Sequence, residues 1–367
     1  MQISVVHAVV TAIAGASIGI MAVCLVAVDM PRDSRHSPYH ISRYILAAGY
    51  TLLSVACILA VAAGVRYSHE VNPTVRVITL ATAALQGVLF QYTILSLINP
   101  MSLSLRRIMA SLVPILAVDL VLVCTYLWGG ERLSGIVFHV VCGLYFLLLA
   151  IYERIFRREY DDYMVAMNNY FAGDESFRLR WIRRAYYLAV SLGILAGVSL
   201  FLPSVPFVAF IGLVAVFYVY YAVRYIGYGR VFPRMAPALE PVFDEVGEPQ
   251  TGRDEVAAKV GEWIAEKGFS QPGITLASMS GELGLPHSAV AMYIRSQGGR
   301  SFRRWINELR VDEARQVMTT CPGMSMQEVA EMAGFRSLRL FVRSFEAVEG
   351  EEPRYFRERV GGHAPEK

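Results

Sequence analysis

The sequence predicts an all-α protein in two parts: a bundle of seven transmembrane helices, followed by a soluble helical domain in which a helix-turn-helix pattern occurs twice. Three observations lead to this prediction. Mean hydropathy is +0.42 and 55% of the residues are apolar, values too high for a soluble protein of 367 residues. The apolar residues gather in runs long enough to cross a bilayer, which takes about 17–25 helical residues. Residues 253–367 instead combine short amphipathic segments with glycine-containing turns.

Seven apolar runs of membrane-spanning length precede residue 229. The first shows no polar stripe at a 3.6-residue period, which a helix in a soluble core would have. Because only two residues precede it and it is too long for the apolar core of a signal peptide, we expect a retained first span with its N-terminus outside. The seven runs are 3–28, 44–65, 77–98, 108–128, 136–152, 186–202 and 206–226.

The distribution of arginine predicts the orientation. Positive residues accumulate in cytoplasmic loops. Seven spans with an outside N-terminus put twelve loop arginines in the cytosol and three outside, and they put the C-terminal domain in the cytosol. The cytosolic set is Arg32, Arg35, Arg43, Arg106, Arg107, Arg154, Arg157, Arg158, Arg178, Arg180, Arg183 and Arg184, and the outside set is Arg66, Arg76 and Arg132.

The loops restrict how a signal could reach the protein. The outside loops, 66–76, 129–135 and 203–205, are too short to fold as a ligand-binding domain. Any signal must therefore be a small molecule in the bundle, a lipid or bilayer property, or a partner membrane protein. The long cytosolic loop 153–185 should continue the fifth span as a helix. Its Trp181 and arginines favour a membrane-surface anchor, and the alternative is a lever that couples the bundle to the C-terminal domain.

Polar side chains inside the predicted spans form a second group of candidates. A carboxylate at mid-span, as at Asp119, is costly and usually faces a bundle interior with a partner. Gln86 lies at a similar predicted depth, so we expect a hydrogen bond between the two, with Gln91 a turn deeper and His139 nearer the outer face. Such groups are either interhelical contacts worth about 1 kcal/mol or a ligand or proton site.

No pattern typical of catalysis or of metal binding is found. The sequence has no HExxH, GxSxG, P-loop or paired-carboxylate arrangement. Its five cysteines are isolated, and no CxxC spacing indicates a zinc site or a disulfide framework. We therefore expect no enzyme activity, no metal and no cofactor.

A proline-rich segment separates the two parts. Residues 229–252 contain Pro233, Pro237, Pro241 and Pro249 and an acidic bias, which is typical of a linker. The predicted domains are therefore a transmembrane domain at 1–228, this linker, and a C-terminal domain at 253–367.

The C-terminal domain begins with a predicted helix at 254–266, with Asp254 as its N-cap. A first helix-turn-helix pattern follows. Thr275 or Ser278 opens a short helix, Gly284 allows the turn, and a second helix starts near Pro286. This second helix should bury Val290, Tyr293 and Ile294 and direct four side chains outward: Ser288, Ala291, Met292 and Arg295.

The same pattern then recurs after a long amphipathic helix at 301–318. Ser325 with Glu328 three residues later forms a capping box. Gly334 and Phe335 form the turn, and Ser337 caps a second outward-facing helix.

Residues 274–360 resemble the DNA-binding domain of the AraC/XylS family, in which two helix-turn-helices are joined by a long helix. The matching positions of the second half are Ser325, Met326, Val329, Ala330, Gly334, Phe335, Ser337, Phe341, Phe345, Gly350, Pro353, Phe356 and Arg357. The arrangement of the whole chain resembles membrane-bound AraC-type regulators with an N-terminal multi-helix domain. The resemblance implies a transcription regulator in the bacterial cytoplasmic (inner) membrane that binds double-stranded DNA, and we expect a homodimer.

The resemblance also implies which side chains would contact DNA. Ser288, Ala291 and Met292 would face bases from the first recognition helix, and Leu338, Arg339, Val342 and Arg343 from the second. Arg339 and Arg343 are the best base-reading candidates, because arginine can pair with guanine through two hydrogen bonds. Phosphate contacts are expected from Arg295, Arg300, Arg336 and Arg354.

The sequence departs from the family pattern in its charge. Glu346 and Ala347 replace the usual basic residues after the last phenylalanine, and residues 253–367 hold sixteen Lys/Arg against sixteen Asp/Glu. Non-specific affinity for DNA should therefore be modest, because it depends on the phosphate charges that the protein neutralises. The alternative is a receptor-like membrane scaffold whose helix-turn-helix domain docks a protein.

Overall fold

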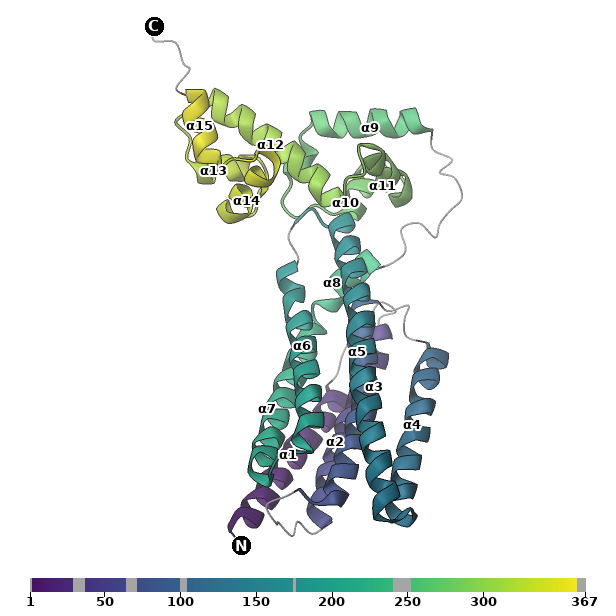
Figure 1. The fold of residues 1–367 in the computed structure, drawn as a ribbon. Helices are drawn as coiled ribbons and strands as arrows, with labels where there is room; N and C mark the ends of the chain where they lie inside the picture. The colour runs from purple at the N-terminus through teal and green to yellow at the C-terminus, as the bar shows by residue number, and fades with distance from the viewer. Residues whose placement is uncertain are drawn as a thin grey trace. The chain divides into compact units, whose positions relative to one another are not determined.

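The computed structural model describes residues 2–28, 37–63, 71–99, 104–173, 176–239 and 252–361. These residues form helices, with one isolated β-bridge and no strand among them, so the predicted all-α fold is confirmed (Figure 1). The chain divides into two compact units. The first comprises residues 1–163 and 179–237, and the second comprises residues 164–178 and 238–367.

Seven long helices make up most of the first unit. Six of them are long and apolar enough to cross a membrane. The helices are α1 (Gln2–Ala27), α2 (Ser37–Ala62), α3 (Pro73–Ile98), α4 (Leu105–Trp128), α5 (Gly130–Tyr170), α6 (Ser176–Ser199) and α7 (Ser204–Tyr228), followed by the short α8 (Phe232–Met235) and the 3₁₀-helix η3 (Ala236–Leu239). Only Gly129 separates α4 from α5, so the predicted loop 129–135 is mostly helical.

The helix that does not meet the membrane-spanning criterion is α6. Its first half carries Arg180, Arg183 and Arg184. The apolar stretch that remains, from Ala185 to Ser199, is shorter than the roughly 17–25 residues that a span needs. The prediction of seven apolar spans is therefore supported for six helices and not for the sixth along the chain.

Contacts between helices explain why α6 is nevertheless part of the bundle. The hydroxyl of Tyr145 on α5 donates to the backbone carbonyl of Gly193 on α6 at 2.8 Å. Two turns earlier on α6, the ring of Tyr186 stacks on that of Phe156 of α5 with centroids 3.6 Å apart. These contacts attach α6 to α5 within the first unit.

Tyrosines also join α2 to α7. The Tyr39 hydroxyl donates to the carbonyl of Tyr225 at 2.8 Å, and their rings stack at 4.8 Å. The Tyr50 hydroxyl donates to the carbonyl of Tyr218 at 2.5 Å. These contacts satisfy the phenol groups inside an apolar environment, where an unpaired hydroxyl would be costly.

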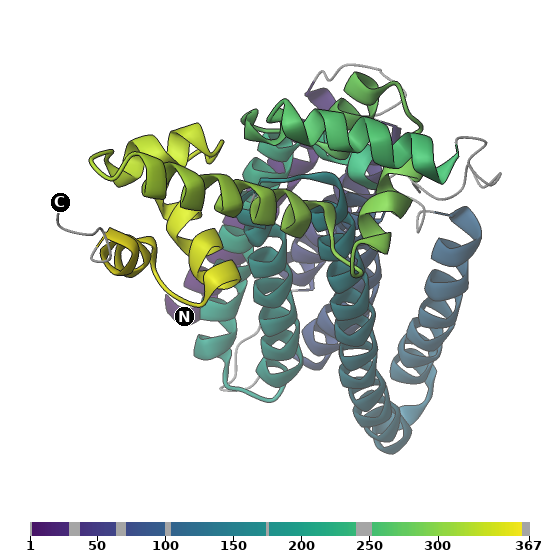
Figure 2. The ribbon, with the colours of Figure 1, turned by 90° about the horizontal axis from the view of Figure 1, so that it is seen from above.

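The margin of the bundle is apolar where it would meet lipid. Helix α4, the blue helix at the edge in Figure 2, exposes Leu116, Leu120 and Trp128. Exposed apolar surface of this kind is rare on soluble monomers and is typical of contact with a membrane or a partner.

The described start of the predicted linker is folded rather than extended. Phe232 and Met235 are fully buried, and Phe232 lies against the rings of Tyr39 and Tyr228. These apolar side chains anchor the segment despite its prolines. Pro241 and Pro249 lie outside the described residues.

The second unit contains the predicted double helix-turn-helix. Its helices are α9 (Arg253–Ala265), the 3₁₀-helix η4 (Gly268–Ser270), α10 (Leu276–Leu283), α11 (His287–Ser296), α12 (Phe302–Thr320), α13 (Met326–Met332), α14 (Leu338–Glu349) and α15 (Pro353–Gly361). Helix α9 is capped by Gly252, not by Asp254, which lies in its first turn.

The end of α5 belongs to this second unit. The β-bridge pairs Phe171 with Thr275, and the Ala172 amide donates to the carbonyl of Ile274 at 3.3 Å. Arg303 at the start of α12 donates to the Asn168 side chain, also at 3.3 Å. The predicted helical continuation of the fifth span is confirmed, because α5 runs without interruption to Tyr170.

Candidate nucleic-acid interface

Local hydrogen bonds fix the first helix-turn-helix. The Thr275 hydroxyl accepts from the Ser278 amide at 3.1 Å, and the Ser278 hydroxyl accepts from the Thr275 amide at 3.0 Å. This capping box starts α10. Gly284 then takes a φ of +61°, a conformation that glycine adopts without strain, and Pro286 caps α11.

Helix α11 buries one face in the domain core and exposes the opposite face to solvent. Val290 and Ile294 are buried as expected, whereas Tyr293 is only half-buried and Ala289 is buried in addition. Of the four predicted outward residues, Met292 and Arg295 are exposed and Ser288 and Ala291 are half-buried.

The second helix-turn-helix repeats this construction. The Ser325 hydroxyl accepts from the Glu328 amide at 3.2 Å, and the Glu328 carboxylate accepts from the Ser325 amide at 2.8 Å. The hydrogen bonds that the Ser325 side chain and the Ser325 amide donate to the carboxylate favour its charged form, so they lower the pKa of Glu328. Ser337 caps α14 through the amide of Leu340.

The core of this half orients α14. Phe341 and Phe345 are fully buried with Val329 and Ala330 of α13. With those side chains inward, Arg339 and Arg343 are exposed, and Leu338 and Val342 are half-buried. Two arginines separated by one helical turn therefore share the outer face of α14.

The turn of this motif lies directly against the segment before α10. Gly334 has a φ of +84°, and a Cβ there would lie 2.4 Å from the carbonyl oxygen of Ser270. A second close approach involves Gly273. The side chain of Arg336 packs over this glycine, and a Cβ there would clash with the guanidinium. Arg336 is exposed, as a phosphate contact requires, but its guanidinium already lies beside this loop.

Arg310 on α12 completes this contact, and sequence reasoning missed it. Its side chain is 2% exposed and donates to the carbonyls of Phe269 and Gln271, each at 2.8 Å. Burial and the neighbouring Arg336 guanidinium lower the pKa of Arg310 to about 10. One signal was available in the sequence: Arg310 falls between Ile306 and Ala314 at helical spacing on the buried side of α12.

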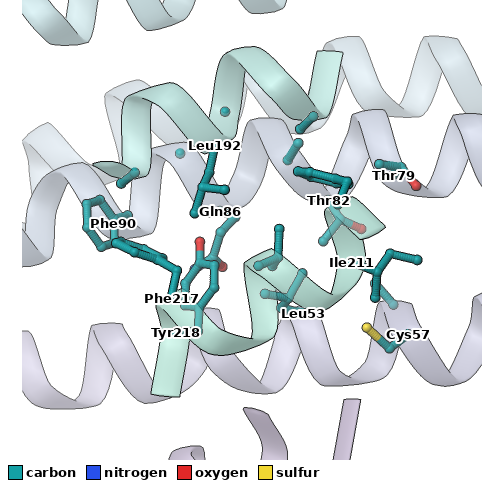
Figure 3. A pocket seen from close by; sticks show the side chains of 18 of the residues that line it. Leu53, Cys57, Thr79, Thr82, Gln86, Phe90, Leu192, Ile211, Phe217 and Tyr218 are labelled. Carbon is teal, nitrogen blue, oxygen red and sulfur yellow. The ribbon is translucent and has the colours of Figure 1, made fainter. Parts of the chain in front are cut away.

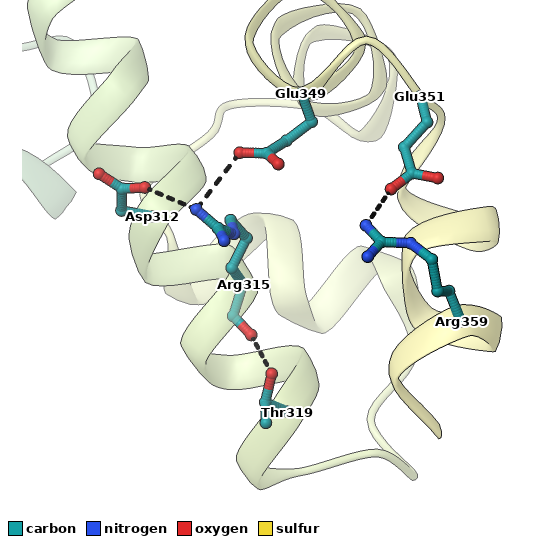
Figure 4. Close-up of polar contacts among 6 residues, drawn as sticks. All are labelled: Asp312, Arg315, Thr319, Glu349, Glu351 and Arg359. Carbon is teal, nitrogen blue, oxygen red and sulfur yellow. Dashed lines mark hydrogen bonds and ion pairs between the residues drawn. The ribbon is translucent and has the colours of Figure 1, made fainter. Parts of the chain in front are cut away.

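Several carboxylates of the domain form ion pairs with its own arginines. Arg315 lies 3.4 Å from Asp312 and 3.5 Å from Glu349, and Arg359 pairs with Glu351 (Figure 4). These two arginines therefore compensate carboxylates of the same domain. Arg300 similarly lies 3.0 Å from Glu308, although it was expected to contact phosphate.

The polar residues of the predicted spans do not form one cluster. Gln86 and Gln91 line a cavity in the first unit, but Asp119 and His139 are not among its lining residues. The expected hydrogen bond between Gln86 and Asp119 is absent, since neither Asp119 oxygen has a hydrogen-bond partner among the described residues and Gln86 lies beside the Tyr218 hydroxyl instead. Asp119 is 7% exposed, and His139 is exposed with Nδ1 2.7 Å from the carbonyl of Gly135. Depth along a span fixes the height of a side chain but not the direction in which it points.

Comparison with known proteins agrees with this geometry. A family model described as a helix-turn-helix domain, of the AraC type, matches residues 279–359, from within α10 to within α15. No curated protein and no solved structure matches the chain. The C-terminal part is thus an AraC-type helix-turn-helix domain, a domain of DNA-binding transcription regulators and not of catalysts.

Proposed function

We propose that the protein is a membrane-embedded, one-component transcription regulator, because an AraC-type helix-turn-helix domain follows a bundle with six helices apolar enough to cross a membrane. In this proposal the domain binds double-stranded DNA in the cytosol. The bundle keeps it at the bacterial inner membrane and senses a signal or localises the protein. No catalytic step is required.

The observation that carries the proposal is the outer face of α14. Arg339 and Arg343 are exposed while Phe341 and Phe345 are fully buried. An exposed arginine on a recognition helix can donate two hydrogen bonds to guanine, and each such pair discriminates by about 1–3 kcal/mol. We assign base reading to these two arginines, with Leu338 and Val342 beside them.

The first recognition helix, α11, offers fewer hydrogen-bonding side chains to the bases than α14. Ser288, Ala291 and Met292 of α11 would face bases through small or apolar contacts, and Arg295 would meet a phosphate. Arg336 and Arg354, both exposed, would add phosphate contacts around the second half. Binding as a homodimer would raise the effective local concentration of a domain whose net charge is close to zero.

The side of the membrane on which the DNA-binding domain lies depends on whether α6 is a span. If α6 crosses the bilayer with the six apolar helices, an outside N-terminus gives a cytosolic DNA-binding domain. The arginine bias of the loops supports this arrangement, because twelve loop arginines then lie in the cytosol and three outside. Reporters fused to the two termini should therefore lie on opposite sides of the membrane.

Helix α5 offers a route from the bundle to the domain. Residues up to Tyr163 belong to the first unit, and Met164 onward to the second. Its end contacts the residues just before α10 and the start of α12. Of the two roles considered for the loop 153–185, these contacts support the lever. An Asp161→Pro substitution would break α5 and should change DNA occupancy, whereas Asp161→Ala should not.

The proposal is tested by genome-wide crosslinking of the tagged full-length protein. Wild type should give discrete peaks that vanish in an Arg339→Ala/Arg343→Ala double variant. Arg304→Ala, an exposed arginine on α12, is the matched control and should keep them. Loss of about 1–3 kcal/mol per arginine corresponds to a roughly 5- to 150-fold loss of affinity at each position.

One observation favours a second function. Residues 253–367 balance sixteen basic against sixteen acidic residues, and Arg315 and Arg359 are engaged in internal ion pairs. A domain with so little attraction for phosphate could dock a protein instead, as part of a receptor-like membrane scaffold. Absence of crosslinking peaks, with the intact protein in the membrane fraction, would favour the scaffold.

A further inference from the structure

The first unit contains a cavity of about 160 Å³ between α1, α2, α3, α5, α6 and α7 (Figure 3). An apolar cavity of about 150 Å³ in an engineered protein holds a benzene-sized molecule. The cavity is therefore large enough for part of a small organic ligand. Pockets of this kind between the helices of a bundle are common ligand sites.

The cavity wall carries no carboxylate, ammonium or guanidinium group that could hold an ion. Its lining among the described residues includes Leu53, Ile211 and Phe217, contains no Asp, Glu, Lys or Arg, and has one histidine, His7. A charged ligand would lose its hydration there without gaining an opposite charge. The wall consequently selects for an uncharged, mostly apolar molecule.

One amide faces this apolar space with most of its hydrogen-bonding capacity unused. Gln86 on α3 is 5% exposed and lines the cavity. Its amide interacts with the Tyr218 hydroxyl, but neither its oxygen nor its nitrogen makes a hydrogen bond of good geometry with a described residue. The amide lies beside Tyr218 in Figure 3 and against Gly49 of α2, where a Cβ would come within 2.9 Å of the amide oxygen. A buried amide with so few hydrogen bonds is rare, because it forfeits those that water would give it.

Further polar groups that line the cavity are also buried without a hydrogen bond to a described residue. The Thr11 hydroxyl, the Gln91 amide nitrogen and the hydroxyls of Tyr152 and Tyr186 are each buried and make no hydrogen bond with a described residue. The Gln86 amide can both donate and accept hydrogen bonds, and hydroxyl groups line the same apolar cavity. The amide is therefore complementary to a ligand group that can also donate and accept hydrogen bonds.

We propose that this cavity binds an uncharged, largely apolar small molecule whose single polar group, such as a primary amide or an alcohol, pairs with the Gln86 amide. The molecule is either a constituent of the bilayer or a diffusible signal, since both can present this chemistry. This ligand site would give the bundle the sensing role of the proposed function. Any effect of the ligand on DNA binding rests on that function, whereas binding of the ligand to the cavity does not.

The chain offers a matched pair of cavity-filling variants. Gly87 lines the cavity, and a Cβ there would meet no atom within 4 Å, so Gly87→Phe places a ring in the space. Gly143 on α5 is equally open but exposed and not a lining residue, so Gly143→Phe is its control. Gln86→Leu keeps the volume of the side chain and removes the amide.

The test measures the melting temperature of the full-length protein in nanodiscs of one synthetic phospholipid, with octanamide as the probe. Octylammonium, with a chain of the same length and a charge, is the comparison ligand. Octanamide should stabilise wild type and Gly143→Phe by mass action, and octylammonium should not. Gln86→Leu should weaken octanamide binding by roughly 2- to 12-fold, the equivalent of one neutral hydrogen bond, and Gly87→Phe should abolish the shift.

Two results would overturn the proposal. Equal shifts in wild type and in a folded Gly87→Phe variant would mean that octanamide acts through the bilayer. An unchanged affinity in Gln86→Leu would mean that the amide does not recognise the ligand, and this variant decides the matter if Gly87→Phe does not fold.

Mass spectrometry of protein purified from its host separates the two sources. A neutral molecule that accompanies wild type and Gly143→Phe but not Gly87→Phe indicates a bilayer constituent, whereas octanamide binding without such a molecule indicates a diffusible ligand. Both outcomes support the site. Crosslinking to DNA is read separately, so ligand binding without DNA occupancy would sustain this inference and refute the proposed function.

Discussion

Arg310 provides the sharpest test of how the helix-turn-helix domain is held together. Replacing it with methionine keeps an unbranched side chain of similar length but removes a guanidinium that is 2% exposed. The carbonyls of Phe269 and Gln271 then lose donors that lie 2.8 Å away, and the ring of Phe335 loses a cation 5.8 Å from its centre. The segment before α10 is thereby released from α12.

The expected loss follows from these contacts. Each hydrogen bond from a charged donor contributes about 1.5–3 kcal/mol net. The cost of burying the charge, which the lowered pKa of Arg310 reflects, is recovered on substitution and offsets part of the sum. Arg310→Met should therefore lower the free energy of unfolding by about 3 kcal/mol. Arg304→Met is the matched control, since Arg304 is exposed and pairs with Glu308 on the surface, which should cost less than about 1 kcal/mol.

The assay is equilibrium unfolding of residues 253–367 in urea. Trp263 and Trp305, whose rings lie 6.2 Å apart, are the only tryptophans in this range and report on it by fluorescence. With slopes of about 1–3 kcal/mol/M, the midpoint should fall by roughly 1–3 M. Midpoints for Arg310→Met and Arg304→Met that coincide would refute the reasoning, because the buried guanidinium would then contribute no more than an exposed one.

Further predictions concern the same domain and the membrane topology. Gly334→Ala should destabilise the domain by more than about 2 kcal/mol and Gly350→Ala by about 1 kcal/mol, since both have positive φ but only Gly334 lies against the Ser270 backbone; equal losses in urea unfolding would contradict the close approach. The hydrogen bonds from Ser325 lower the pKa of Glu328, so its contribution to stability is present above the unfolded pKa of about 4.3 and is lost as the pH falls through the folded value. The stability difference between wild type and Glu328→Gln should accordingly shrink on acidification from pH 7, and a difference independent of pH would count against the capping box. Finally, reporters at the two termini should lie on opposite sides of the membrane, and finding both on one side would exclude α6 as a span.

Much of the second unit follows from its local sequence. Thr275, Ser325 and Ser337 cap their helices as expected, and Gly284 and Gly334 adopt the left-handed turns assigned to them. Each of these features depends on residues within four positions of one another, so the chain encodes it without reference to distant contacts. The alternation of buried phenylalanines and exposed arginines on α14 is similarly a matter of helical period.

What the sequence alone determined is thus the all-α class, the apolar helices, and the position and turns of the helix-turn-helix domain. The tertiary structure decided the rest. Whether Gln86 meets Asp119, why Arg310 is buried, and what surrounds the cavity all depend on the rotation of helices about their axes and on partners far away in the chain. Composition and period place a side chain on a helix face, but only the packing of helices against one another decides what that face meets.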